Sequence, residues 1–177
     1  SKIKPKNIYN SYNDFVNNHG RFQLIEFTNF SLINIYVPNS GTNFEYRTNI
    51  WDKGIKKLID DYKSKPLIIT GDFNVVNNEI DMWNPDTYNK HKSPGIFKEE
   101  IEMFNKYLEN YTDCFRYKYP DKKEYTWWDM RSKGREKGNG WRIDYFLINN
   151  KYADMIKDSM IDNSIYGSDH CPIILEI

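Results

Sequence analysis

The stretch KPLIITGDFN, residues 65–74, constrains the fold of this chain most strongly. A short continuous apolar run begins at Leu67 and ends in a turn at Gly71, as in a strand that is buried on both faces. Asp72 and Asn74 follow this turn, separated by one phenylalanine. The stretch therefore predicts a fully buried strand whose C-terminal end delivers polar side chains to one place.

The other patterns predict further strands interspersed with helices. RFQLIEF and FSLINIYVP are two apolar-rich runs separated by TN, as in a hairpin. Two later stretches have the apolar spacing of amphipathic helices, and the first opens with Thr42 and Glu45 at the spacing of a capping box. Their apolar stripes consist of Trp51, Ile55, Leu58, Ile59 and Tyr62, and of Phe97, Ile101, Phe104 and Leu108. Strands are also expected at EYTWWD, WRIDYFLIN and PIILEI.

Length and composition narrow the class of protein. A chain of 177 residues fits one domain with a sizeable core. Its 25 basic and 25 acidic residues exclude bulk attraction to nucleic acid or to an anionic membrane, so phosphate binding needs a local patch. Cys114 and Cys171 match no metal or redox spacing and are expected to be reduced core residues. No apolar stretch is long enough to cross a bilayer, and SKIKPKNIYN does not resemble a signal peptide, which predicts a soluble, intracellular protein.

Asp72 and Asn74 form the first pair of candidate site residues. If the strand persists past Gly71, residues two apart leave the same face, so that a carboxylate and an amide converge. The alternative is that Asp72 caps a turn.

WRIDYFLIN repeats the pattern, because Arg142 and Asp144 would share one face of a strand that becomes buried. The alternative here is an ion pair between Arg142 and Asp144.

The C-terminal stretch YGSDHCPIILEI places Asp169 and His170 side by side before another apolar run. Burying an ionisable pair costs free energy unless the groups have hydrogen-bond or charge partners, so such residues at a strand end indicate a catalytic or binding role. A carboxylate would fix the tautomer of His170 and raise its basicity, and Asp144 could be that partner. Asp169 cannot easily face the same way as His170 and would be left to bind a cation or a water. A structural histidine is the alternative, but several carboxylates and an Asn at strand ends favour a hydrolytic site.

Tryptophans and cations are interleaved around residue 130. The loop DMRSKGREKGNG carries four cations and is bracketed by three tryptophans: Arg131, Lys133, Arg135 and Lys137, and Trp127, Trp128 and Trp141. Flat stacking surfaces beside phosphate-pairing cations are typical of nucleic-acid binding. The alternative is that the tryptophans belong to the core and the cations to a solvated loop.

A smaller motif, YVPNSG, ends another expected strand. Its Tyr36 and Asn39 could hold a phosphate oxygen through a phenol and an amide. The alternative is a simple turn formed by Pro38.

In this order, YVPNSG, GDFN, YTWWDMRSKGREKGNGWRIDYFLIN and GSDHCPI resemble the exonuclease III type of class II apurinic/apyrimidinic endonuclease, in the endonuclease/exonuclease/phosphatase superfamily. The resemblance covers essentially all 177 residues. The long tryptophan segment is far more specific than GDFN or SDH, which lipid and sugar-phosphate phosphodiesterases also carry. The resemblance implies a single α/β domain over residues 1–177, a four-layered sandwich of two packed mixed sheets flanked by helices and incomplete at its N-terminal side. It also implies a Mg²⁺-dependent DNA repair nuclease that hydrolyses the phosphodiester 5′ to abasic sites, with 3′–5′ exonuclease and 3′-phosphodiesterase activity.

The same resemblance implies a role for each candidate residue. Asp72 would orient or deprotonate the attacking water, and Asn74 would hold that water or stabilise the charged phosphoryl oxygens. His170, oriented by Asp144, would contact the scissile phosphate. The remaining implied roles are phosphate contacts by Tyr36 and Asn39, an abasic-sugar pocket of Trp127 and Trp141, DNA-backbone contacts by Arg131, Arg135, Arg142 and Asn84, and ligands of Mg²⁺, or of Mn²⁺ in its place, by Asp169, Asp72 and Asn74.

Members of this family carry an additional N-terminal portion, whose first strand holds an Asn and whose second strand is followed by a Glu, both at the principal metal site. Neither motif is present in this chain, and Glu26 matches a later strand. Two interpretations follow. One is a monomeric nuclease acting on double-stranded DNA with abasic or 3′-blocked lesions, and the other is a non-catalytic DNA-binding remnant. A phosphodiesterase for lipid or soluble phosphates is disfavoured by the tryptophan segment and by the lack of a membrane-facing apolar segment.

Overall fold

Short strands and helices alternate along the chain, in a computed structural model that describes residues 3–11, 20–60, 62 and 65–177. The strands are β1 (Asn7–Tyr9), β2 (Phe22–Glu26), β3 (Ser31–Tyr36), β4 (Leu67–Asp72), β5 (Tyr111–Asp113), β6 (Trp127–Trp128), β7 (Gly140–Trp141), β8 (Asp144–Asn149), β9 (Asp158–Ile161) and β10 (Ile173–Glu176). The α-helices are α1 (Asp52–Asp60), α2 (Pro85–Tyr88), α3 (Lys98–Leu108), α4 (Cys114–Lys118) and α5 (Gly134–Lys137). A π-helical turn, η1 (Tyr46–Trp51), precedes α1, and two 3₁₀ segments are η2 (Glu79–Asp81) and η3 (Asn150–Met155).

One six-stranded mixed sheet organises the molecule, with the strand order β1-β2-β3-β4-β8-β5. β3 and β4 are parallel, and every other neighbouring pair in this sheet is antiparallel. The predicted hairpin is confirmed as β2 and β3. The predicted buried strand is confirmed as β4, which lies between β3 and β8 and whose first three residues are buried.

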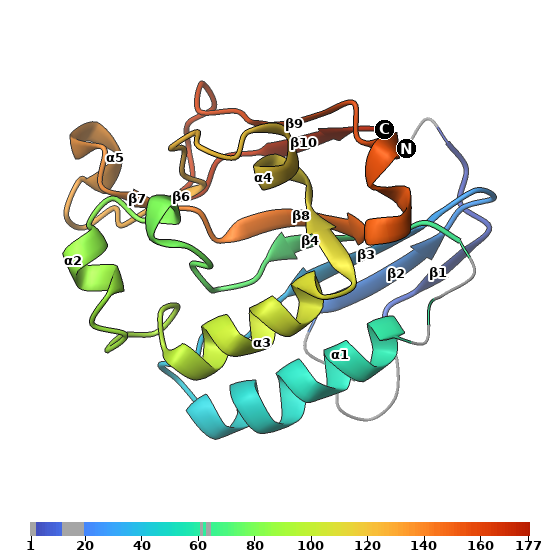
Figure 1. Ribbon diagram of the computed structural model, residues 1–177, viewed down its shortest axis with the longest axis horizontal. Coiled ribbons are helices and arrows are strands. Elements are labelled where there is room, and N and C mark those ends of the chain that lie inside the picture. The colour runs from blue at the N-terminus through green and yellow to red at the C-terminus, as the bar shows by residue number, and fades with distance from the viewer. Residues whose placement is uncertain (1–2, 12–19, 61, 63–64) are drawn as a thin grey trace.

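Both faces of this sheet carry an apolar core, which explains why β4 reads as a continuous apolar run. Leu67 and Ile69 of β4 pack on the face that α1 and α3 cover, together with Trp51, Phe104 and Leu147. Ile68 points the other way, into a cluster with Cys114, Ile148, Ile156 and Leu175. Figure 1 shows α1 and α3 along one face, and α4, β9 and β10 along the other. The described layers are therefore helices, a large sheet and a two-stranded antiparallel sheet, which confirms the α/β class.

The first long helix forms as predicted, but its start differs from the prediction. Trp51, Ile55, Leu58 and Ile59 are buried in one stripe. The capping box of Thr42 and Glu45 is wrong, because Glu45 makes no capping hydrogen bond and the Thr42 hydroxyl donates to the Asn39 carbonyl at 2.9 Å. The side chain of Asn43 accepts the Tyr46 N–H at 3.0 Å in its place, as the short acceptor before a helix does.

Two further expectations concern the cysteines and the membrane. Cys114 and Cys171 are both buried and free, as predicted. Within the described ranges, the structure contains no helix with the length and apolarity needed to span a bilayer.

Candidate active site

Three of the predicted site residues lie side by side at one edge of the large sheet. Tyr36 of β3 is the register partner of Asp72 of β4, and Asp72 is in turn the partner of Asp144 of β8. Gly71 allows this close approach, because its φ is +131° and an added Cβ would lie 1.8 Å from the Ile35 carbonyl oxygen. The sheet register alone therefore brings a phenol and two carboxylates together.

Asp72 and Asn74 interact directly, as the prediction of convergence requires. Asn74 has a positive φ of 49°, which turns the chain back so that its N–H donates to Asp72 Oδ1 at 2.8 Å. Its amide nitrogen donates to the Val37 carbonyl at 2.8 Å and to Asp72 Oδ2 at 3.1 Å. Asn39 completes the group by donating to Asn74 Oδ1 at 3.3 Å. Asp72 thus caps a turn and also joins the site, so both interpretations of GDFN hold.

The environment of Asp72 makes it a proton acceptor suited to neutral pH. Burial and the nearby negative charge of Asp144 raise the pKa of Asp72 to about 7, although the Asn74 N–H and the charges of His170 and Arg47 oppose this rise. A general base is most effective when its pKa lies near the working pH. The carboxyl group of Asp72 can therefore accept a proton and release it again near neutrality.

His170 is held by Asp144, as the sequence predicted. The distance between His170 Nδ1 and Asp144 Oδ2 is 2.9 Å, which leaves Nε2 for a substrate. Burial lowers the pKa of His170, but the hydrogen bond and charge of Asp144, with smaller contributions from Asp72 and Asp169, outweigh burial and raise the pKa overall. The hydrogen bond to Asp144 fixes the ring, and the raised pKa means that the charged form of His170 is stabilised relative to a free imidazole, which suits contact with a phosphate.

Asp169 lies beside His170 and contributes to the same cavity, contrary to the expectation that the two face apart. The reason is local, since the chain bends at Gly167, Ser168 and Asp169 and does not form a regular strand before His170. Trp127 Nε1 donates to Asp169 Oδ2 at 3.1 Å, and the Ser168 hydroxyl lies 3.3 Å from Oδ1. These contacts with Trp127 and Ser168 hold the carboxylate of Asp169 in place.

These residues enclose one cavity of about 210 Å³. Trp127 and Trp141 form an aromatic wall, with ring centroids 5.4 Å apart and planes inclined by 62°. Gly95 lies against this wall, where an added Cβ would be 3.2 Å from the Trp141 ring. The lining consists of Tyr36, Asn39, Asp72, Asn74, Pro94, Gly95, Trp127, Trp141, Ile143, Asp169 and His170. The tryptophans are thus not simply core residues, except Trp128, which is buried.

Arg142 does not belong to this cavity, and its predicted contact with DNA is wrong. The side chain is fully buried and pairs with Asp81 at 2.7 and 2.9 Å and with Asp113 at 2.7 and 3.2 Å. Arg116 also pairs with Asp81. The alternative ion pair between Arg142 and Asp144 is wrong too, because β8 begins only at Asp144 and the two side chains take different directions. Arg142 therefore stabilises the fold.

The other predicted DNA-contact residues lie outside the cavity in different surroundings. Arg131 is exposed on the loop that follows β6. The Arg135 side chain is hydrogen-bonded within the protein, because its guanidinium donates to the carbonyls of Asn163 and Ile165 at 2.9 and 2.7 Å. The side-chain oxygen of Asn84 accepts the Thr87 N–H at 3.2 Å and caps α2. Of these residues, Arg131 alone presents its charge freely to solvent.

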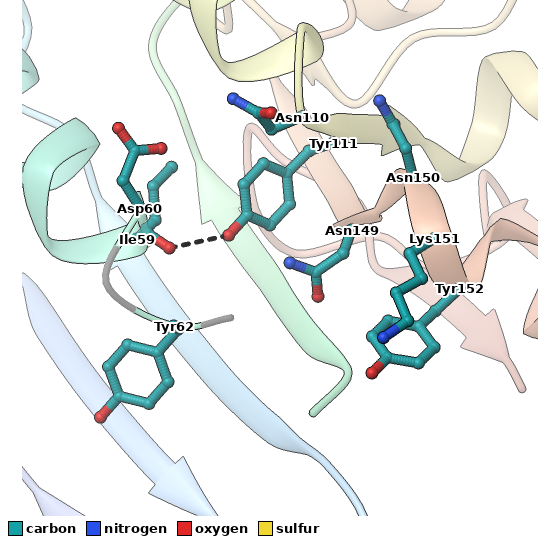
Figure 2. Close-up of a pocket in the computed structure, with 9 residues that line it drawn as sticks. All are labelled: Ile59, Asp60, Tyr62, Asn110, Tyr111, Asn149, Asn150, Lys151 and Tyr152. Atoms are coloured by element: carbon teal, nitrogen blue, oxygen red, sulfur yellow. Dashed lines mark hydrogen bonds between the residues drawn. The ribbon is translucent and has the colours of Figure 1, made fainter. Parts of the chain in front are cut away.

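A larger pocket lies at the opposite end of the sheet (Figure 2). It is lined by Tyr111 and Asn149, and the Asn149 side chain accepts the N–H of Leu67, the first residue of β4. Leu67 and Asp72 are five residues apart in β4, about 17 Å at about 3.3 Å per residue. The Tyr111 hydroxyl donates to the Ile59 carbonyl at 3.0 Å, and burial raises its pKa to about 12. The described residues that line this pocket include no histidine and one carboxylate, Asp60, so it lacks the paired carboxylates and imidazole found around Asp72.

The cavity that holds Asp72 offers oxygen donors suited to Mg²⁺. Among the described residues, no three His, Cys, Asp or Glu side chains form a closed metal cage. Mg²⁺ does not need one, since it is usually bound by one or two carboxylates, substrate phosphates and several waters. The crowding of carboxylates that raises the pKa of Asp72 is an environment that a cation would stabilise. The residues present fit Mg²⁺ in kind and in charge.

Three residues that line the cavity were not predicted from the sequence, namely Pro94, Gly95 and Ile143. Ile143 could have been found, because it lies between the predicted residues Trp141 and Asp144. Pro94 and Gly95 belong to a polar loop, and their position depends on the Val76 N–H, which donates to the Gly95 carbonyl at 2.8 Å. No local pattern predicts that contact.

Residues 10–170 match the model of the Endonuclease/Exonuclease/phosphatase family. A DNA-(apurinic or apyrimidinic site) endonuclease of Dictyostelium discoideum is 41% identical over 164 residues, covering 88% of this chain and 45% of the relative. An exodeoxyribonuclease of Bacillus subtilis is 37% identical over 164 residues, covering 89% and 64%. The solved structure of a Neisseria 3′ phosphatase bound to a product DNA hairpin superposes with a TM-score of 0.89 at 23% identity, covering 99% of this chain and 72% of that one. The chain thus spans about half to two thirds of the length of these curated relatives.

Proposed function

Because the chain belongs to the Endonuclease/Exonuclease/phosphatase family, we propose that it carries the hydrolytic site of a DNA repair nuclease that cuts the phosphodiester 5′ to an abasic site. One observation carries the proposal. A single cavity combines the Asp72 carboxylate, which Asn74 orients, with the Asp144-bound His170 and a wall of two tryptophans. The first two groups suit phosphodiester hydrolysis, and the wall suits a sugar without a base.

In the proposed reaction, Asp72 accepts a proton from a water molecule as the water oxygen bonds to the phosphorus. The bond between phosphorus and the 3′ oxygen of the preceding nucleotide breaks, and this oxygen takes a proton from solvent. His170 donates a hydrogen bond to a phosphoryl oxygen and offsets its growing charge. Asn74 keeps Asp72 oriented through the two hydrogen bonds described above. Tyr36 and Asn39 line the same cavity and supply further donors to the phosphate.

We propose Mg²⁺ as the cofactor, with Mn²⁺ as a substitute. Asp169 and Asp72 would be its main ligands, and Asn74 would be an additional one. When bound, the ion would neutralise charge on the phosphate oxygens and polarise the phosphoryl group. The preference for hard oxygen ligands supports this choice over softer metals.

The aromatic wall supports a preference for abasic DNA. Trp127 and Trp141 enclose part of a cavity of about 210 Å³ and present flat apolar surfaces to an extruded sugar. Such a pocket excludes an intact nucleotide by size. The same site would accept 3′-blocked ends, which gives 3′–5′ exonuclease and 3′-phosphodiesterase activity as secondary reactions.

A second candidate function is DNA binding without turnover. The observation that favours it is that the chain spans 45% and 64% of the two relatives, whose names describe whole nucleases. Residues outside these 177 would then be needed for catalysis. A phosphodiesterase for lipids or soluble phosphates fits the aromatic wall less well.

The test is Mg²⁺-dependent nicking of a duplex that carries one abasic-site analogue. We expect cleavage 5′ to the analogue that disappears in chelator and in Asp72→Ala. The control variant is Arg131→Ala, whose exposed side chain lies outside the cavity and whose loss should affect binding more than turnover. Binding without cleavage by the folded chain would support the second candidate, and cleavage that persists in Asp72→Ala would refute the assignment of the base.

A further inference from the structure

A second hollow adjoins the catalytic cavity and shares Asp169 with it. We call it the side groove. It measures about 320 Å³ and is lined mainly by Trp128, Met130, Lys133, Arg135 and Tyr166. Its surface is more apolar than polar, whereas the catalytic cavity is more polar. A substrate bound at Asp169 would therefore extend into a hollow of different chemistry.

Arg135 holds the two sides of the side groove together. Its guanidinium carbon lies over the ring of Trp128 and over the ring of Tyr166, at 4.6 and 4.1 Å from their centroids. The same side chain donates to the carbonyls of Asn163 and Ile165, in the segment that leads to Tyr166. A planar cation held by two rings and two carbonyls has little freedom, so it fixes the orientation of the Tyr166 ring.

Tyr166 is thus an ordered aromatic ring that still faces solvent. It is 75% exposed, and Met130, which also lines the groove, is 70% exposed. Arg135 covers one face of the ring, which leaves the other face for a flat ligand. An exposed aromatic and an exposed Met beside a catalytic cavity mark a binding surface, because large apolar side chains otherwise lose free energy in water.

The charges around the side groove distinguish between the parts of a nucleotide. Two carboxylates, Glu136 and Asp169, are in its lining, and the Arg135 guanidinium in the same lining already contacts two carbonyls and two rings, so the groove offers a phosphate no strong net attraction. Lys133 also lines the groove, and the exposed Arg131 and Lys137 lie on the same loop, where they can pair with phosphates that pass outside. An uncharged planar base inside with its phosphates at the rim satisfies both sets of charges.

We infer that the side groove binds the nucleobase of a nucleotide next to the phosphodiester that is cut, stacked on the open face of Tyr166. This inference rests on the proposed function, since it assigns a place to one more nucleotide of the same DNA substrate. Base stacking on an aromatic side chain tolerates every base, so the side groove should add affinity without adding sequence preference.

The test measures binding of the 177-residue chain to a duplex with one abasic-site analogue, in chelator so that nothing is cut. 2-Aminopurine placed on either side of the analogue reports stacking by a loss of fluorescence. We expect quenching at one of the two positions for the wild type and for Tyr166→Phe, which keeps the ring. Tyr166→Ala should abolish the quenching and weaken binding roughly tenfold. Tyr117→Ala removes a tyrosine that is 48% exposed on α4, outside the groove, and should bind like the wild type.

The outcomes separate this inference from the proposed function. If Tyr166→Ala binds and quenches like the wild type and still prefers the abasic duplex, the side-groove inference is wrong and the proposed function stands. If the wild type shows no preference for abasic over intact duplex, both are wrong. Circular dichroism melting of Tyr166→Ala shows that the variant is folded, and a variant that fails to fold is replaced by Tyr166→Leu, which keeps an apolar side chain without the ring.

Discussion

Replacing Arg142 with Met should destabilise the fold strongly, because this side chain is the centre of a buried ion cluster. Arg142 makes four hydrogen bonds to Asp81 and Asp113, at 2.7 to 3.2 Å, and all three side chains are buried. Met fills a similar volume but leaves two carboxylates that only Arg116 partly compensates. Breaking a buried pair by removing one partner costs about 3–5 kcal/mol. That is a large part of the roughly 5–15 kcal/mol by which such domains are stable.

Urea unfolding followed by tryptophan fluorescence measures this loss, with Arg131→Met as the matched control. Arg131 is exposed, so its replacement should change the free energy of unfolding by less than about 0.5 kcal/mol. The two variants should behave oppositely toward DNA, with Arg131→Met weakening binding and leaving stability intact. An Arg142→Met protein as stable as the wild type but deficient in DNA binding would refute the structural role assigned to Arg142.

Three further predictions test the sheet and the site. Gly71→Ala should lower the free energy of unfolding by at least about 1–3 kcal/mol in a thermal melt, because its Cβ would lie 1.8 Å from the Ile35 carbonyl at a φ of +131°. Burial raises the pKa of Asp81, but Arg142 and Arg116 outweigh burial and lower the pKa overall. The ionised Asp81 therefore contributes fully to stability above about pH 4, and this contribution is lost as the pH falls through the lowered pKa. In a plot of Tm against pH, Asp81→Asn should accordingly show a smaller fall of Tm at acid pH than the wild type. Asp144→Asn should reduce kcat for nicking about 100-fold with little change in KM, because it removes the carboxylate that orients His170; an unchanged kcat would contradict that role.

Most residues that the sequence named as a site lie around one cavity, because they follow strands whose register is fixed by buried apolar runs. Asp72, Asp144 and Tyr36 are placed by pairing alone, and His170 needs only one additional contact with Asp144. The wrong prediction for Arg142 has its cause in long-range contacts. Arg142 is paired with groups 61 and 29 residues away, and nothing near it in the sequence indicates them. The short elements β5 and α4, with three and five residues, carry too little periodicity to be predicted.

The charges around Arg142 and those around Asp72, two of the charged groups in the described part of the chain, differ in what they do for the fold. In the Arg142 cluster each carboxylate faces a guanidinium, and the pKa of Asp81 is lowered because the charged form is stabilised. At the edge of the sheet Asp72 faces another carboxylate across the register, and burial raises its pKa because the charged form is destabilised. A fold selected for stability alone would place a neutral side chain at residue 72. The crowded carboxylates cost stability, as perturbed ionisable groups at functional sites commonly do, and the proposed hydrolytic function accounts for that cost.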